Sequence, residues 1–143
     1  EEVVADIVDG AHRELQTALD DHAPMGIRGL TRFFVELMNA SPRPTLVMCG
    51  NDVLAVGAMQ KARELGLQVP GDVSITGFDD IDLAGVVDPK LTTVRVPHNR
   101  MGQAAAEMLI RLINKEQVER RIEIPTEIVE RGTLGPPPSD PAS

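Results

Sequence analysis

The sequence contains no tryptophan or tyrosine and only three phenylalanines. Proteins that bind single-stranded nucleic acid stack bases on aromatic side chains, so this shortage argues against that class of function. The 14 basic residues are outnumbered by 22 acidic ones, which gives a formal net charge of −8. A surface of this charge repels phosphate backbones and anionic membranes, so the chain itself is predicted to be a poor direct DNA binder.

Cysteine and long apolar runs are also scarce. The single cysteine, Cys49, excludes an internal disulfide, and its apolar surroundings predict a small buried side chain rather than a nucleophile. The apolar runs fall well short of the roughly 18 residues that cross a membrane, and residues 1–20 do not resemble a signal peptide. Hydrophobic residues make up 42% of the 143 positions, which predicts one globular domain that we expect to be cytoplasmic.

Two hydrophobic periodicities alternate along the chain, as in a sheet whose strands are joined by helices. The run over residues 45–49 is continuously apolar, which is typical of a strand covered on both faces. In chain order the predicted elements are helices over 11–21 and 27–39, a strand over 45–49, a helix over 52–65 that ends at Gly66, strands over 73–78 and 91–96, a helix whose apolar stripe runs over 101–113, and a strand over 121–131 that is interrupted at Pro125. This order predicts an α/β fold with a parallel sheet.

Polar side chains follow three of the predicted strands where each strand ends. Asn51 follows the first strand, Asp79 the second, and residues 95–99 close the third. Ligands of open parallel sheets bind beyond the carboxyl ends of the strands. A carboxylate beside an amide suits a polyhydroxylated or purine-like ligand, because charged acceptors make the stronger hydrogen bonds.

Each of these residues also has a purely structural interpretation. Asn51 can cap the helix that follows it, and Asp79 and Asp80 are common turn formers. His98 precedes a helix and can be an ordinary surface residue. The patterns alone leave both interpretations open.

Sequence motifs for catalysis are missing. The chain has no serine-hydrolase elbow, no phosphate-binding glycine loop and no zinc-protease motif, and its three histidines lack the spacing of metal ligands. Asp52, Asp79 and Asp80 could hold Mg²⁺ as in phosphotransfer domains, but no strand-end lysine is present to hold a phosphate. We therefore predict no enzyme activity, no metal and no cofactor.

Four stretches have a more specific pattern. Residues 43–58 read RPTLVMCGNDVLAVGA, residues 69–80 read VPGDVSITGFDD, and residues 89–94 read PKLTTV, before the alanine-rich helix that begins near Met101-Gly102. These stretches resemble, in order and spacing, the blocks RPTAVFCANDLMALGAL, VPEDISVVGFDD and PPLTTV of LacI/GalR-family transcriptional regulators. The resemblance covers residues 41–133.

The resemblance implies a type I periplasmic-binding-protein-like effector domain with two subdomains. It assigns residues 1–96 and 122–134 to the C-terminal subdomain and residues 97–121 to a crossover helix of the N-terminal subdomain. Residues 135–143 are too rich in proline and small residues to order themselves, which predicts a disordered tail. With no DNA-binding motif and the rest of the N-terminal subdomain absent, we expect the chain to be part of a longer regulator.

The resemblance also implies functional residues. Asn51 and Asp79 match family positions that contact the effector, and Val96 and His98 match positions facing the cleft. The implied dimer-interface residues are Val53, Leu54, Val56, Ile81, Leu83 and Val87. The implied partners are a small-molecule effector and a second copy in a homodimer, with operator DNA bound only through a domain absent from this chain and no membrane. The alternative is a solute-binding protein of a sugar transport system, which shares the fold.

Overall fold

The computed structural model describes residues 27–138, and the predicted helix over 11–21 lies outside them. In chain order the elements are α2 (Ile27–Met38), β1 (Leu46–Met48), α3 (Asp52–Glu64), β2 (Ser74–Thr76), α4 (Asp82–Val86), β3 (Thr93–Arg95), α5 (His98–Ile113) and β4 (Glu127–Val129). The α/β class is confirmed, and α5 begins at His98, three residues before the predicted stripe, and ends with it at Ile113. The five residues of α4 were not predicted, because a helix of fewer than two turns shows no clear periodicity.

The strands form two two-stranded sheets, β1–β2 and β3–β4, which isolated parallel bridges join. β1 pairs in parallel with β2, and Met48 lies opposite Thr76. A parallel bridge between Thr76 and Thr92 places β3 on the other side of β2. β4 then pairs with β3 in antiparallel orientation. The carboxyl ends of β1, β2 and β3 therefore point to the same edge, as the predicted parallel sheet requires.

The prediction that the first strand is covered on both faces is wrong. Leu46 is 44% exposed and Met48 is 79% exposed, while Val47 between them packs against the core. Among the described residues, β1 pairs only with β2. One face of this strand is therefore open, and its unbroken apolar composition did not reveal that.

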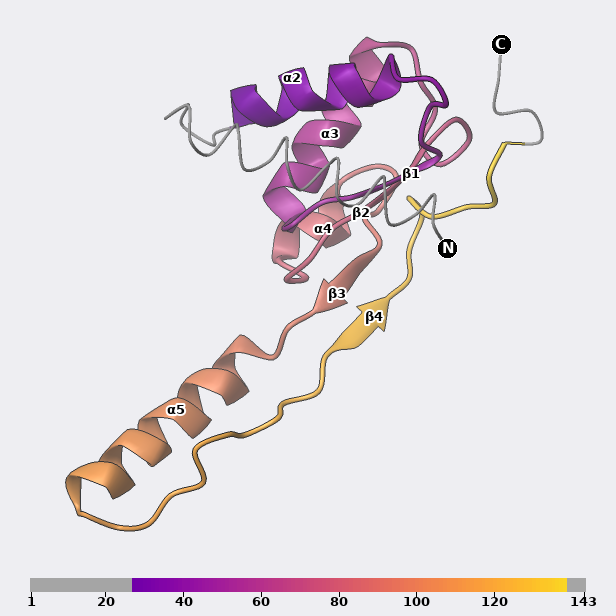
Figure 1. Ribbon diagram of the computed structural model, residues 1–143. Coiled ribbons are helices and arrows are strands. Elements are labelled where there is room, and N and C mark those ends of the chain that lie inside the picture. Colours follow the sequence, from indigo (N-terminus) through magenta and orange to yellow (C-terminus); the bar gives the residue numbers. More distant parts are fainter. Residues whose placement is uncertain (1–26, 139–143) are drawn as a thin grey trace.

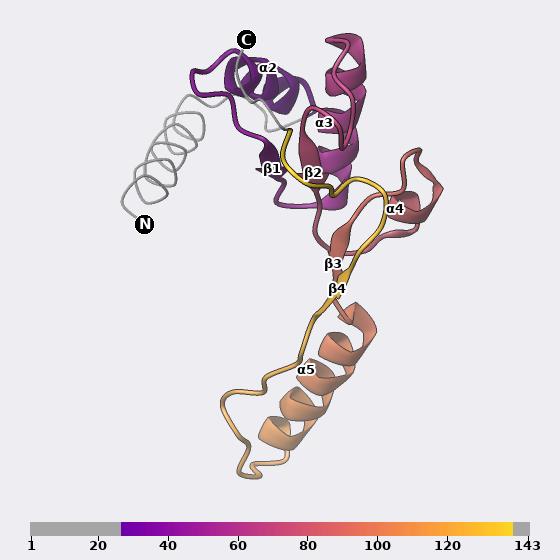
Figure 2. The ribbon, with the colours of Figure 1, turned by 90° about the vertical axis from the view of Figure 1, so that its right-hand side faces the viewer.

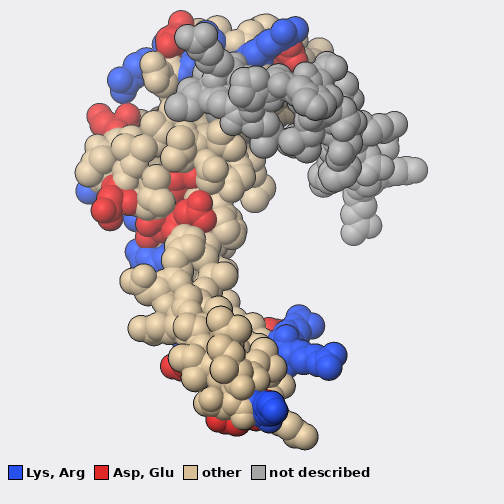
Figure 3. Space-filling view, turned by 90° about the vertical axis from the view of Figure 1, so that its left-hand side faces the viewer, with Lys and Arg blue, Asp and Glu red and all other residues tan. Residues whose placement is uncertain are grey.

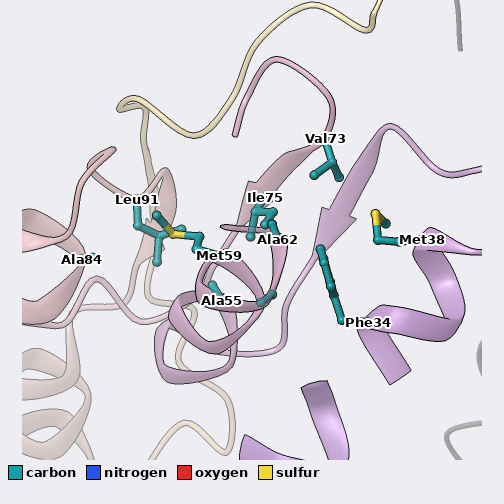
Figure 4. Close-up of a cluster of buried hydrophobic side chains, with 10 residues drawn as sticks. Phe34, Met38, Ala55, Met59, Ala62, Val73, Ile75, Ala84 and Leu91 are labelled. Carbon is teal, nitrogen blue, oxygen red and sulfur yellow. The ribbon is translucent and has the colours of Figure 1, made fainter. Parts of the chain in front are cut away.

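The core lies between the two helices α2 and α3 and the strand β2. Figure 4 shows Phe34 and Met38 of α2 on one side, Leu91 and Ala84 on the other, and Ile75 between them. Small alanines at the buried positions of α3 allow this helix to pack closely on the sheet. The helix ends as predicted, with Gly66 at a positive φ of 74° that an L side chain rarely adopts.

Helix α5 stands apart from the rest of the described chain, connected to it by β3 and β4 (Figures 1 and 2). None of its residues is buried. Its exposed large apolar residues are Met101, Leu109, Ile110, Leu112 and Ile113. Figure 3 shows the broad uncharged surface that results at this end of the molecule. An apolar face of this size is one that a folded protein normally covers.

The segment after β4 returns to the main body. The Ile75 amide donates to the Thr133 carbonyl at 3.0 Å, and the Gly132 amide donates to the Lys90 carbonyl at 2.8 Å. Gly135 is bonded to the Ser74 hydroxyl through its amide at 3.1 Å. The chain is thus still attached at the first residue of the predicted tail, and residues 139–143 lie outside the described part. None of the helices between residues 27 and 138 combines the length and apolarity needed to cross a bilayer.

Candidate functional site

Asn51 is the N-cap of α3. Its backbone is extended, and its side-chain Oδ1 accepts a hydrogen bond from the Leu54 amide at 2.9 Å. The capping interpretation is therefore confirmed. The cap uses the carboxamide oxygen, so the NH₂ group is the part of the side chain that can donate to a ligand.

The beginning of α3 is bonded to the end of β2. The Asp52 amide donates to the Phe78 carbonyl at 2.9 Å. Asn51 precedes one partner of this bond and Asp79 follows the other. Asn51 and Asp79, which match effector-contacting positions of the family, are therefore brought to the same edge of the sheet, although they follow different strands.

Asp79 also contacts the segment that leads from β3 to α5. Its Oδ1 lies 3.5 Å from Nε2 of His98, with the carboxylate 32% exposed and the imidazole 60% exposed. The Asp79 amide donates to the Val94 carbonyl at 2.9 Å, and the Val96 amide approaches the Asp79 carbonyl at 3.5 Å. The structure therefore brings Asp79, Val96 and His98 into contact and places Asn51 at the same edge of the sheet. The role of these four residues in ligand binding remains a prediction.

The backbone at Asp79 and Asp80 is strained. Asp79 has a φ of 107° and Asp80 a φ of 55°, a region that residues other than glycine seldom occupy. Each such residue costs on the order of 1–3 kcal/mol and persists only where its surroundings enforce it. Strain of this kind is common at ligand-binding positions, which supports a functional role for this loop.

Asp52 has a structural role instead. Its side chain is fully buried, and its Oδ2 accepts a hydrogen bond from the Ile81 amide at 2.8 Å. Its Oδ1 accepts one from the Thr93 hydroxyl at 2.5 Å. Both oxygens are thus used within the protein, and residues 27–138 contain no group of three potential ligands that could hold a metal ion. The magnesium alternative has no support in the described part of the chain.

Asp80, which the sequence indicates only as a turn residue, has a buried carboxylate paired with two arginines. Its side chain is only 7% exposed, and its carboxylate pairs with Arg131 at 2.5 Å and with Arg95 at 2.7 Å. Arg95 also pairs with Glu127 across the β3–β4 ladder at 3.0 Å. Burial raises the pKa of Asp80, but the two guanidinium groups outweigh it and lower this pKa below the ordinary aspartate value. The same ion pairs raise the pKa of Arg95, first of all the one with Asp80.

Cys49 directly follows β1 and is partly buried. Burial raises the pKa of its thiol to about 11. The thiol therefore stays protonated at neutral pH, and the protonated form is a poor nucleophile. This agrees with the prediction that the cysteine is a small apolar side chain.

Comparison with known protein families gives one match that spans most of the chain. The family described as the periplasmic binding protein-like domain matches residues 4–134. The chain belongs to this family. The resemblance to LacI-type regulators, drawn from the strand-end blocks, is confirmed by the relatives of this domain.

The curated relatives of this periplasmic binding protein-like domain include a transcriptional repressor. The HTH-type transcriptional repressor PurR of Proteus mirabilis is 45% identical over 104 residues, which are 72% of this chain and 30% of that protein. The chain thus spans about a third of the length of the curated relatives it matches.

Solved structures of LacI-family regulators have the same fold. One from Bifidobacterium animalis subsp. lactis has a TM-score of 0.77 at 29% identity, over 92% of this chain and 50% of that one. A regulator from Enterococcus faecium, solved with bound ribose, has a TM-score of 0.70 at 31% identity, over 78% of this chain and 41% of that one.

The predicted dimer residues of this periplasmic binding protein-like domain lie on α3, on α4 and in the segments next to α4. Val53, Ile81 and Leu83 are exposed, whereas Leu54, Val56 and Val87 are half-buried. Val86, which was not predicted, is the most exposed apolar residue of α4 at 75%. A hollow of about 530 Å³ lies beside this surface, away from Asp79, and is lined by Val56, Met59, Gln60, Arg63, Leu67, Gln68, Val69, Val87, Asp88 and Pro89.

Proposed function

We propose that this chain binds a small polar metabolite at the edge formed by Asn51, Asp79 and His98, as the effector-binding part of a LacI-family transcriptional regulator. Binding changes the operator affinity of the DNA-binding domain of such a regulator. Coupling of this kind between two sites is worth typically about 1–3 kcal/mol. The curated relatives are named as repressors, so the chain is proposed to bind its ligand without converting it.

The observation that carries this proposal is the meeting of an exposed carboxylate and an exposed imidazole at the strand ends. Asp79 and His98 are 3.5 Å apart, and both are accessible to solvent. A carboxylate accepts hydrogen bonds from hydroxyl groups and ring N–H groups, which sugars and purine bases present. The ribose in the Enterococcus faecium structure supports the polyhydroxylated class of ligand.

Substitution of Asp79 by asparagine tests this proposal. The change retains size and the tolerance for a positive φ, but it removes the charge that strengthens the hydrogen bonds to a ligand. A hydrogen bond to a charged group is worth roughly 1.5–3 kcal/mol, so we expect the dissociation constant to rise at least about tenfold. Isothermal titration with D-ribose and a panel of free purine bases measures it, after a thermal-shift screen identifies the binder.

Asp82→Asn is the matched control, since Asp82 is an exposed aspartate three residues further along the chain. It is expected to leave the affinity unchanged. Unchanged affinity in Asp79→Asn would remove this residue from the site. The absence of any sugar or purine base that stabilises the protein would contradict the proposed ligand class.

We also propose that the apolar surface on α3 and α4, made up of Val53, Ile81, Leu83 and Val86, forms a homodimer interface. Val86→Arg introduces a charge that two copies would have to bury together. We therefore expect the dissociation constant of the dimer, measured by analytical ultracentrifugation, to rise by at least about tenfold. Ile128→Arg is the control, because Ile128 is also 75% exposed but lies on β4. Equal effects of the two substitutions would argue against this interface.

A further inference from the structure

The loop that presents Asp79 is attached to the body on both sides by backbone groups. The Asp79 amide donates to the Val94 carbonyl at 2.9 Å. The Ile81 amide donates to Oδ2 of Asp52 at 2.8 Å. Within residues 27–138, the peptide group between Asp79 and Asp80 has only the long contact of its carbonyl with the Val96 amide, at 3.5 Å. Backbone bonds alone therefore leave the middle of the loop weakly fixed.

The side chain of Asp80 supplies the missing attachment. Arg131 donates Nη2 to one oxygen of this carboxylate at 2.5 Å, and Arg95 donates Nε to the other at 2.7 Å. Arg131 is itself immobilised, because its Nη1 donates to the Leu91 carbonyl at 2.8 Å and its backbone amide donates to Oγ1 of Thr92 at 2.9 Å. The carboxylate is thus fixed to Arg95 at the end of β3 and to Arg131 in the segment after β4.

These pairs differ from an ordinary surface ion pair. In the α2 pair between Arg32 and Glu36 the side chains are 85% and 59% exposed, and pairs of that kind contribute little. Asp80 and Arg131 are 7% and 18% exposed, so water competes far less for their hydrogen bonds. Their contact can therefore enforce a backbone conformation that the loop would otherwise leave.

We propose that Asp80 is a positioning residue, whose ion pairs with Arg131 and Arg95 keep Asp79 in its strained conformation and its carboxylate beside His98. The inference rests on the proposed function, in which Asp79 binds the ligand. In this arrangement Asp80 itself does not contact the ligand. It fixes the second of two consecutive positive φ angles, and the direction of the Asp79 side chain follows from that.

Asp80→Asn is the main test, because asparagine retains the size and the tolerance for a positive φ but loses the charge. The affinity for D-ribose and the purine bases, measured well below the unfolding temperature of the variant, is expected to fall about tenfold. The reason is that the Asp79 carboxylate must be held within about 0.5 Å of its binding geometry. Arg131→Met should have the same effect, and the double variant should bind no more weakly than either single variant. Glu127→Gln is the control, since it removes only the exposed partner of Arg95.

A second measurement does not need a ligand. The ring signals of His98 in ¹H–¹³C NMR spectra are expected to shift in Asp79→Asn, because the neighbouring carboxylate becomes neutral. They should shift in the same direction in Asp80→Asn and stay unchanged in Glu127→Gln. Unshifted His98 signals in Asp80→Asn, together with unchanged affinity, would overturn the positioning role.

The two proposals fail in different ways. If Asp79→Asn weakens binding and Asp80→Asn changes neither the affinity nor the His98 signals, the proposed site stands and the positioning role is wrong. If Asp79→Asn leaves binding unchanged, the proposed site is wrong. The shift of the His98 signals in Asp80→Asn then still decides whether Asp80 orients Asp79.

Discussion

Gly77→Ala is expected to lower the free energy of unfolding by about 2–4 kcal/mol, which is large for the addition of one methyl group. A Cβ atom at this position would overlap Oδ1 of Asp52 and would lie only 3.0 Å from Cδ2 of Leu91. It would also lie 3.2 Å from Cα of Asp52, so the start of α3 would have to move. Both neighbours are fully buried, and neither has room to give way.

Gly50→Ala is the matched control. Gly50 follows β1 as Gly77 follows β2, but a Cβ atom added there meets nothing within 4 Å. We expect the free energy of unfolding of this variant to lie within about 0.5 kcal/mol of the wild-type value, as is usual for surface substitutions. Urea unfolding followed by circular dichroism measures both variants, and a Gly77→Ala protein as stable as Gly50→Ala would contradict the close packing at this strand end.

The longer helices could be predicted because their periodicity is local. The stripe of apolar residues from Met101 to Ile113 predicted α5 to within three residues of its start at His98, although that helix has no buried residue. Periodicity reports the composition of a helix face, and this holds whether or not a partner covers the face. The same limitation explains the error at β1, where an unbroken apolar run did not reveal that Met48 is exposed.

The candidate site was predicted in part. The rule that ligands bind at strand ends identified Asn51 and Asp79, and the family resemblance added His98. The structure places Asp79 beside His98 and Asn51 at the same edge of the sheet. The ion pairs of Asp80 could not be predicted, because Arg131 lies 51 positions away in the chain and Arg95 lies 15 positions away. An aspartate in a turn looks the same in the sequence whether its carboxylate is solvated or buried between two arginines.

Asp52 shows the same limitation at the start of α3. In the sequence it is the ordinary acidic residue of a first helical turn, where it interacts favourably with the helix dipole. The structure shows that it connects three elements. Its carboxylate bonds the Ile81 amide before α4 and the Thr93 hydroxyl on β3. Its neighbours Asn51 and Phe78 then take their positions at the strand ends through the bond between the Asp52 amide and the Phe78 carbonyl.

Asp52→Ala is accordingly expected to lower the free energy of unfolding by about 3–5 kcal/mol, because it leaves the part-buried Ile81 amide and the buried Thr93 hydroxyl without their acceptor. Asp82→Ala is the control, since Asp82 is the acidic residue in the first turn of α4 but is exposed. Its loss should cost no more than about 1 kcal/mol, the usual worth of a helix-dipole interaction. Thr93→Val in the Asp52→Ala background should cost less than it does alone, because its hydrogen bond is already lost. Equal costs for the two alanine variants, measured by urea unfolding, would mean that the Asp52 carboxylate acts only on the helix dipole and does not connect the strand ends.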